Sequence, residues 1–216
     1  MIADEAIDLI PPSADPRAHA CATWMLRWPG VLVEDRGPNR GRALDEILNA
    51  YRSRWSLSRD TDLPWCAILA SVAWAISADR YLWGRSLSEI APTLLRPAWW
   101  SSKSPLGDWY GAVHSLESIG RARGLWSERA ELAVRAPDAR IVGAMLCRDR
   151  RGSGSDPISG QRLRAYPGHV DIAIAPLDED RVLAVGGNVG NEVRIVERSL
   201  SDPRLRGAVL LPSSRR

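Results

Sequence analysis

Three short segments of this sequence carry side chains that could act together as a nucleophile and a base. The first is Pro-Trp-Cys at 64–66, where Cys66 directly follows a loop and opens an apolar run. A cysteine in the first turn of a buried helix lies at the positive end of the helix dipole, which stabilises a thiolate and lowers the thiol pKa. The alternative interpretation of Cys66 is a buried cysteine that serves only in packing.

The second and third segments supply a candidate base and a residue to orient it. His169 opens an apolar stretch directly after a Pro-Gly turn, and an imidazole held there has a pKa suited to a general base. Gly186, Gly187 and Asn188 end the next apolar stretch, and the Asn188 amide could hold the imidazole ring in place. The alternatives are a strand histidine without a catalytic role and a turn-forming Gly-Gly-Asn sequence.

Helical patterns dominate the first half of the chain, where the nucleophile must be positioned. The compact apolar run CAILASVAWAISA predicts a buried helix over 66–78. Apolar spacing predicts further helices over 16–28, 44–51 and 109–123, while the stretch 79–107, rich in Pro, Ser and Trp, is predicted to be irregular. The first fifteen residues form an acidic lead, interpreted as an N-terminal tail.

The second half changes to the pattern of β-strands. Strands are predicted over 140–148, 169–176, 181–186 and 192–198, with one more near 207–212 and a polar loop over 150–167. Asp178, Glu179 and Asp180 predict a tight turn between two of the strands. Helices followed by an antiparallel meander indicate an α+β fold, here a single domain over 16–212.

Composition narrows the functional classes. The chain has 216 residues and a formal net charge of +3, and its arginines are scattered among acidic residues, which argues against a nucleic-acid partner. Cys21, Cys66 and Cys147 lack the spacing of metal ligands or of a disulfide framework, so no metal site is expected. The sequence shows neither a secretory signal nor a membrane-spanning run, so we expect the protein to be made as a soluble cytoplasmic protein. It is also predicted to be a monomer.

A family resemblance joins these segments. Pro-Asn-Arg-Gly at 38–41, Leu-Pro-Trp-Cys-Ala at 63–67, Gly-His-Val-Asp-Ile-Ala-Ile at 168–174 and Val-Leu-Ala-Val-Gly-Gly-Asn at 182–188 resemble motifs of the CHAP family, relatives of the NlpC-type endopeptidases. The resemblance implies a papain-like fold and cleavage of an amide bond in bacterial peptidoglycan without a cofactor. It implies Cys66 as nucleophile, His169 as base and Asn188 as orienting residue. Substrate contacts are predicted for Trp65, Asn39, Gly168, Asp171 and Gly187, with packing as the alternative for Trp65 and a loop-fixing role as the alternative for Asn39.

The sequence also departs from the family pattern. Gly143 and Ala144 stand where Gly-Asp is usual, and Gly186 stands where some members carry a glutamate that orients the histidine. Asn188, or alternatively Asp171, is left for that role. Two alternatives to a cell-wall hydrolase follow: an inactive relative that serves as a wall-binding or structural module, and a secreted antibacterial effector or phage lysin. An effector would act at the cell wall after export or release, with an immunity or secretion partner.

Overall fold

A six-stranded antiparallel sheet forms the centre of the molecule, with strand order β1-β6-β2-β3-β4-β5. The computed structural model describes residues 3–36, 40–58, 63, 65–134, 137–150 and 168–212. The strands are β1 Trp126–Glu128, β2 Met145–Asp149, β3 Gly168–Pro176, β4 Arg181–Gly186, β5 Arg194–Ser199 and β6 Leu205–Val209. Strands β2 to β5 follow one another as neighbours, which confirms the predicted meander, and the fold class is α+β.

Strand β3 is the longest and lies in the middle of the sheet between β2 and β4. Its even-numbered residues, such as Val170 and Ile172, join the main hydrophobic core, while Ala173 belongs to a smaller core formed with other strands. Both faces of β3 are therefore covered. The hairpin to β4 begins at Asp178, whose Oδ1 accepts hydrogen bonds from the backbone N–H groups of Asp180 and Arg181, as the predicted turn requires.

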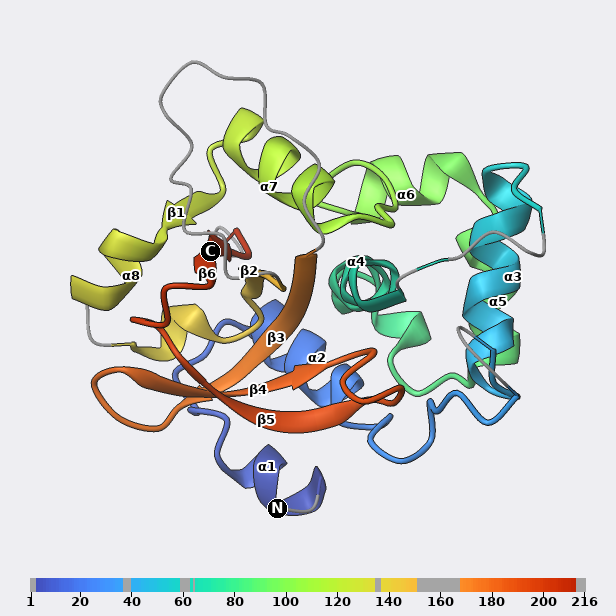
Figure 1. Ribbon diagram of the computed structural model, residues 1–216. Coiled ribbons are helices and arrows are strands. Elements are labelled where there is room, and N and C mark those ends of the chain that lie inside the picture. The colour runs from blue at the N-terminus through green and yellow to red at the C-terminus, as the bar shows by residue number, and fades with distance from the viewer. Residues whose placement is uncertain are drawn as a thin grey trace.

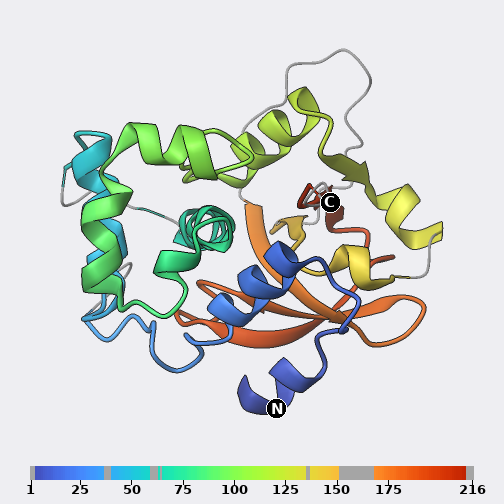
Figure 2. The ribbon, with the colours of Figure 1, turned by 180° about the vertical axis from the view of Figure 1, so that it is seen from behind.

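The helices gather mainly around one end and one side of this sheet. They are α1 Ala3–Asp8, α2 Pro16–Met25, α3 Leu44–Arg54, α4 Trp65–Ser77, α5 Leu87–Leu94, α6 Pro97–Lys103, α7 Val113–Ala122 and α8 Arg129–Val134, with 3-10 turns η1 Arg80–Leu82 and η2 Ala139–Ile141. Helix α4 lies beside β3, with α3, α5 and α6 beyond it (Figure 1). Seen from behind, α2 crosses the sheet next to α4 (Figure 2).

Helix α4 is the buried centre of the helical half, and its bounds agree with the predicted helix over 66–78. All 13 of its residues are buried. Two tryptophan side chains fix the position of α4. Trp74, within the helix, donates from Nε1 to the carbonyl of Gly143 at 2.6 Å. Trp109, outside the helix, donates from Nε1 to the carbonyl of Ile68 at 3.0 Å. Helix α4, which carries Cys66 in its first turn, is thus held against the segment that leads into β2.

The stretch 79–107 is more ordered than predicted, since it contains η1, α5 and α6. The start of α5 is a capping box, in which Ser86 Oγ accepts from the Glu89 N–H and the Glu89 carboxylate accepts from the Ser86 N–H. Pro97 occupies the first turn of α6, where a proline costs no hydrogen bond. The prediction of an irregular segment was wrong because serine and proline were taken as loop formers rather than as helix starts.

Two smaller differences concern the ends of the sheet and of the chain. The short strand β1 was not predicted, and its three residues pair with β6 from Trp126 opposite Val209. The acidic lead forms α1, whose Ala6 is fully buried in the main core together with the nearby Ile10. Part of the predicted tail is therefore packed against the domain. Among the described helices, none is long and apolar enough to cross a membrane.

Candidate active site

The predicted nucleophile and base come together where the start of α4 meets the start of β3. Cys66 is the second residue of α4 and is 1% exposed. Burial raises the pKa of its thiol, but a hydrogen bond with His169 and the charge of that ring lower it. A hydrogen bond from the Val170 backbone and the charge of Arg150 act in the same direction, so that the Cys66 pKa lies below its ordinary value.

The other two cysteines show what burial does without such neighbours. Cys21 and Cys147 are free and buried, like Cys66. Burial raises the pKa of Cys21, against a smaller effect of the Arg17 charge. Burial and the negative charge of Glu117 raise the pKa of Cys147 well above its ordinary value. The thiolate form is therefore easier to reach at Cys66 than at the other two positions.

His169 is held between a carboxylate and a guanidinium. Its Nε2 lies 2.8 Å from Oδ1 of Asp171, and its Nδ1 lies 3.4 Å from Nη2 of Arg150. Burial lowers the pKa of the ring, but the charge and hydrogen bond of Asp171 and the contact with Cys66 outweigh it and raise the pKa to about 9. In the neutral ring, Nε2–H would donate to Asp171 and leave Nδ1 as the basic nitrogen.

Asp171 is fully buried and is bound from two sides. Besides His169, it accepts from Arg198 of β5, whose Nε lies 2.7 Å from Oδ2 and whose Nη2 lies 3.3 Å from Oδ1. Burial raises the pKa of Asp171, but the charges and hydrogen bonds of these two partners lower it to about 2. The carboxylate therefore remains ionised over the whole range in which the histidine titrates.

Gly186 explains how the orienting carboxylate reaches the ring. It pairs with Asp171 across β3 and β4. A Cβ atom on Gly186 would lie 1.9 Å from Oδ1 of Asp171 and 3.0 Å from Nε2 of His169, so the space above this glycine is filled by the His169–Asp171 pair. Gly186 carries no side chain, and the carboxylate of Asp171 on the neighbouring strand occupies the space beside it.

The predicted role of Asn188 is corrected by this arrangement. Asn188 is half-buried, has a φ of 62°, and lines the same hollow as His169. The ring nitrogen that needs an orienting partner, Nε2, is bound by Asp171 instead. The prediction that Asp171 contacts substrate is wrong as well, because its side chain is fully buried. Asp171 takes the role that was assigned first to Asn188.

Two further predicted substrate contacts, Trp65 and Gly187, pack against each other. Trp65 is fully buried, and its Nε1 donates to Oε1 of Glu34 at 2.9 Å. A Cβ atom on the buried Gly187 would lie 2.7 Å from Cζ3 of the Trp65 ring. The tryptophan packs against the backbone at the end of β4 and so fixes the distance between the start of α4 and the sheet. These contacts give Trp65 and Gly187 a packing role, and any contact of theirs with substrate stays a prediction.

The remaining predicted contacts are not decided by these interactions. Asn39 lies outside the described residues. Gly168 opens β3 and is partly exposed, so its contact with substrate stays a prediction. Among the described residues, no group of three or more His, Cys, Asp or Glu side chains could hold a metal ion.

Arg150 and Arg198 are parts of the site that were not predicted from the sequence. Arg150 directly follows β2, where Arg148 pairs with His169, so the register alone brings it near the ring. Arg198 lies 27 residues from Asp171, and only the sheet order places β5 next but one to β3. For Asp171 a signal existed: His169 and Asp171 are two apart on one strand, and side chains with this spacing share a face.

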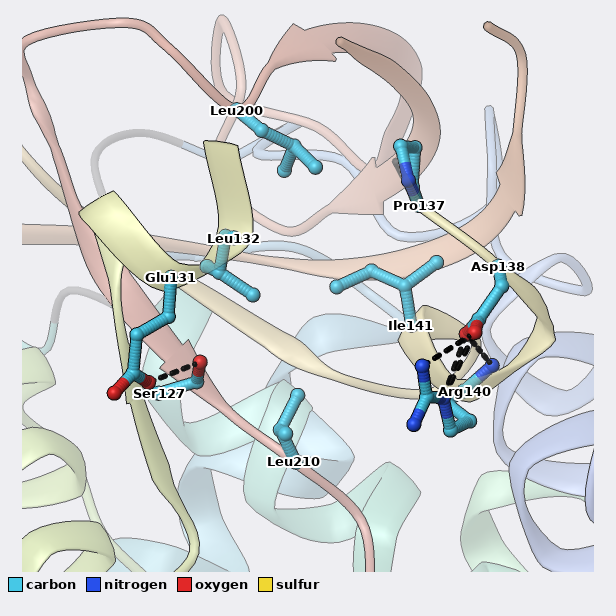
Figure 3. Close-up of a pocket in the computed structure, with 9 residues that line it drawn as sticks. All are labelled: Ser127, Glu131, Leu132, Pro137, Asp138, Arg140, Ile141, Leu200 and Leu210. Carbon is cyan, nitrogen blue, oxygen red and sulfur yellow. Dashed lines mark hydrogen bonds and ion pairs between the residues drawn. The ribbon is translucent and has the colours of Figure 1, made fainter. Parts of the chain in front are cut away.

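Two hollows lie near the sheet, and one of them belongs to this site. A hollow of about 220 Å³ is lined by Arg148, Asp149, Arg150, His169, Asn188, Val189, Arg198 and Arg204. A second one of about 330 Å³ is formed by β1, α8 and η2 and is shown in Figure 3. Its polar contacts join Ser127 to Glu131 and Arg140 to Asp138, and neither cysteine nor histidine lines it. The smaller hollow is therefore the one next to the base.

Comparison with known proteins adds no relative to this picture. No protein-family model, no curated protein and no solved structure matches the chain. The resemblance to a family thus depends on the short motifs around Cys66, His169 and Gly186–Asn188, and the chemistry has to be argued from the geometry of the site itself.

Proposed function

We propose that this protein is a cysteine amidohydrolase or endopeptidase with a papain-like fold of the NlpC/CHAP type, which cleaves an amide bond in bacterial peptidoglycan. One observation carries the proposal. Cys66 lies in the first turn of a buried helix, where His169 lowers the pKa of its thiol, and Nε2 of His169 is held by the buried carboxylate of Asp171. This is the set of a nucleophile, a base and an orienting group that acyl transfer by a thiol needs.

The reaction would begin from a Cys66 thiolate and a His169 imidazolium. The thiolate attacks the amide carbonyl carbon, and the N–H groups at the start of α4 stabilise the oxyanion that develops. Nδ1–H of His169 then protonates the leaving amine as the C–N bond breaks, which leaves a thioester on Cys66. A water molecule gives its proton to Nδ1 and attacks the thioester, and the carboxylic acid product departs as the thiolate re-forms.

The order of elements supports the papain-like part of the proposal. The nucleophile is on a helix in the first half of the chain, while the base and the orienting carboxylate are on the meander that follows. The alternative of an inactive relative was motivated by the lack of an acidic residue that orients the histidine. Asp171 supplies such a residue and so argues against that alternative. An effector or lysin that acts on the wall after export or release would use the same chemistry.

Digestion of purified sacculi tests the proposed function. The wild-type protein is expected to release soluble fragments with new amino groups, and Cys66→Ala is expected to lose this activity by a factor on the order of 10⁶. Cys147→Ala is the matched control, because it removes a second buried thiol and is expected to keep most of the activity. Equal release by wild type and Cys66→Ala, or none by wild type, would contradict the proposal.

A further inference from the structure

The hollow beside His169 is unusually rich in positive charge. Four arginines line it, from three strands and the segments next to them: Arg148, Arg150, Arg198 and Arg204. His169 also lines it and carries a proton at neutral pH, because its pKa is about 9. Five positively charged groups thus face a space of about 220 Å³, which is large enough for a small acidic group of a substrate.

Each of two carboxylates near this hollow is bound by two of the cationic side chains that line it, rather than by one. Asp202 is bound by both Arg148 and Arg204, the latter at 3.3 Å. Asp171 is likewise bound by both His169 and Arg198.

Asp149, which is 5% exposed, is the third carboxylate at this place. Among the described residues, five cations face three carboxylates and the Cys66 thiolate, so the hollow keeps an excess of positive charge. Arginine is the side chain best suited to bind a carboxylate through two parallel hydrogen bonds.

From this excess we infer that the hollow is a subsite for a carboxylate of the substrate, one that lies close to the amide bond to be cleaved. The inference rests on the proposed function, and it narrows the substrate to acidic peptides. Arg150 links the subsite to the reaction, because its guanidinium contacts Nδ1 of His169 and its charge also acts on Cys66. An anion bound by Arg150 would therefore lie beside the reacting atoms.

Arg204 is the residue that tests the subsite with the least disturbance of the chemistry. Its side chain is 55% exposed, and its backbone N–H donates to Oδ1 of Asp202 at 2.8 Å. Arg140 is a matched control in the second hollow, since its backbone N–H donates to Oδ1 of Asp138 at 2.8 Å in the same two-residue spacing. Substitution of either arginine by glutamine removes one charge from an Arg–Asp pair at the surface.

The experiment uses two peptides that differ in one group: L-alanyl-γ-D-glutamyl-L-lysine with the glutamyl α-carboxylate free, and the same peptide with that group amidated. Affinity is measured by calorimetry on full-length Cys66→Ala, in which no turnover interferes. The free carboxylate is expected to bind about tenfold more tightly than the amide, as a charge-assisted hydrogen bond would give. The added change Arg204→Gln or Arg150→Gln should reduce this preference about threefold or more, and Arg140→Gln should leave it unchanged.

Binding and cleavage separate the two proposals. Equal affinity for the two peptides, or a preference that survives both Arg150→Gln and Arg204→Gln, overturns the carboxylate subsite even if the wild-type protein cleaves both peptides. A preference for the free carboxylate that depends on Arg204, in a protein whose wild type hydrolyses neither peptide nor sacculi, supports the subsite and rejects the proposed hydrolase.

Discussion

Two fully buried carboxylates, Glu117 in α7 and Asp171 in β3, each accept hydrogen bonds from two cationic side chains among the described residues, but the chemistry of these partners differs. Glu117 accepts from Arg121, one turn along its own helix, and from Arg206 of β6, with Nε of Arg206 2.8 Å from Oε2. Both partners keep their charge at every physiological pH. This cluster ties α7 to the sheet, and neither of the two described arginines that bind Glu117 exchanges a proton near neutrality.

At Asp171 one of the two cationic partners is a histidine. Arg198 supplies a permanent charge, as the arginines do at Glu117, while His169 can gain or lose a proton. The effect appears at the cysteines nearby: the negative charge of Glu117 raises the pKa of Cys147, whereas His169 lowers that of Cys66. Burial thus raises the pKa of Cys147 beside a carboxylate, whereas at Cys66 a neighbouring histidine outweighs the effect of burial and lowers the pKa.

The largest expected effect that separates the two clusters is on catalysis. Asp171→Asn is expected to lower kcat on a cleaved peptide by about 10⁴-fold, because the amide no longer stabilises the imidazolium or fixes its tautomer. Glu117→Gln makes the same chemical change in the other cluster and is expected to lower kcat by less than about threefold. Steady-state kinetics at pH 7 measure both, and similar losses for the two variants would show that the comparison is wrong.

The second expected effect is on stability and is largest at the other cluster. Glu117→Ala removes the fully buried carboxylate that Arg121 and Arg206 both bind, and should lower the free energy of unfolding by about 3–5 kcal/mol because a buried ion pair is broken. Glu128→Ala removes the other carboxylate that Arg121 binds, but this one is 47% exposed, and its loss should cost about 1 kcal/mol or less. Urea denaturation followed by circular dichroism compares them, and equal values would contradict a structural role for Glu117.

A smaller effect is expected at Gly186, which lies against the Asp171 cluster. Gly186→Ala places a methyl group where Oδ1 of Asp171 lies, and should destabilise the protein by about 1–3 kcal/mol. It should also reduce kcat, because the carboxylate must move away from His169. Gly84→Ala is the control, since nothing lies within 4 Å of a Cβ there. Loss of stability with an unchanged kcat would mean that Asp171 does not orient the ring.

The sequence was sufficient to predict the elements that carry the site, and the reason is local. The apolar run at α4 and the alternating residues of β3 are periodic patterns, which need no knowledge of the rest of the chain. The pairing of Cys66 with His169 followed from family motifs. Asp171 was predicted only as the alternative to Asn188, although its spacing from His169 in a strand sets both side chains on one face and favours it as the orienting residue.

What could not be predicted depends on contacts between distant strands. The role of Arg198 follows from the order of β3, β4 and β5, and the importance of Gly186 follows from the space that Asp171 fills. Trp65 shows the opposite case: an aromatic residue next to a nucleophile suggested a substrate contact, whereas its ring is buried against Gly187. A sequence gives the type of a side chain but not the direction in which tertiary packing turns it.

The smallest expected effect concerns pH, and it compares the thiols directly. Because the pKa of Cys66 is lowered and that of Cys147 is raised, iodoacetamide at pH 7 should label Cys66 first in the folded protein, as peptide mapping would show. An ordinary thiol is only a few per cent ionised at that pH, so the advantage of Cys66 over an ordinary thiol is limited to a factor of about 30, and its advantage over Cys147 should be larger. Asp171→Asn should reduce the labelling advantage of Cys66, because the amide no longer stabilises the protonated form of His169.

The pH profile of hydrolysis follows from the same pair of groups, and its sign can be worked out. The pKa of His169 is raised to about 9, so the ring keeps its proton through neutrality and loses it as the pH rises through 9. The proton that must reach the leaving amine is then missing, and kcat/KM should fall about tenfold per unit above that value. The stability that the protonated ring contributes is fully present below about pH 6.5 and is lost over the same rise. If kcat/KM instead increased through pH 9, the Cys66 thiolate would act without a protonated His169. The titratable partner that distinguishes the Asp171 cluster from the Glu117 cluster would then have no role in catalysis.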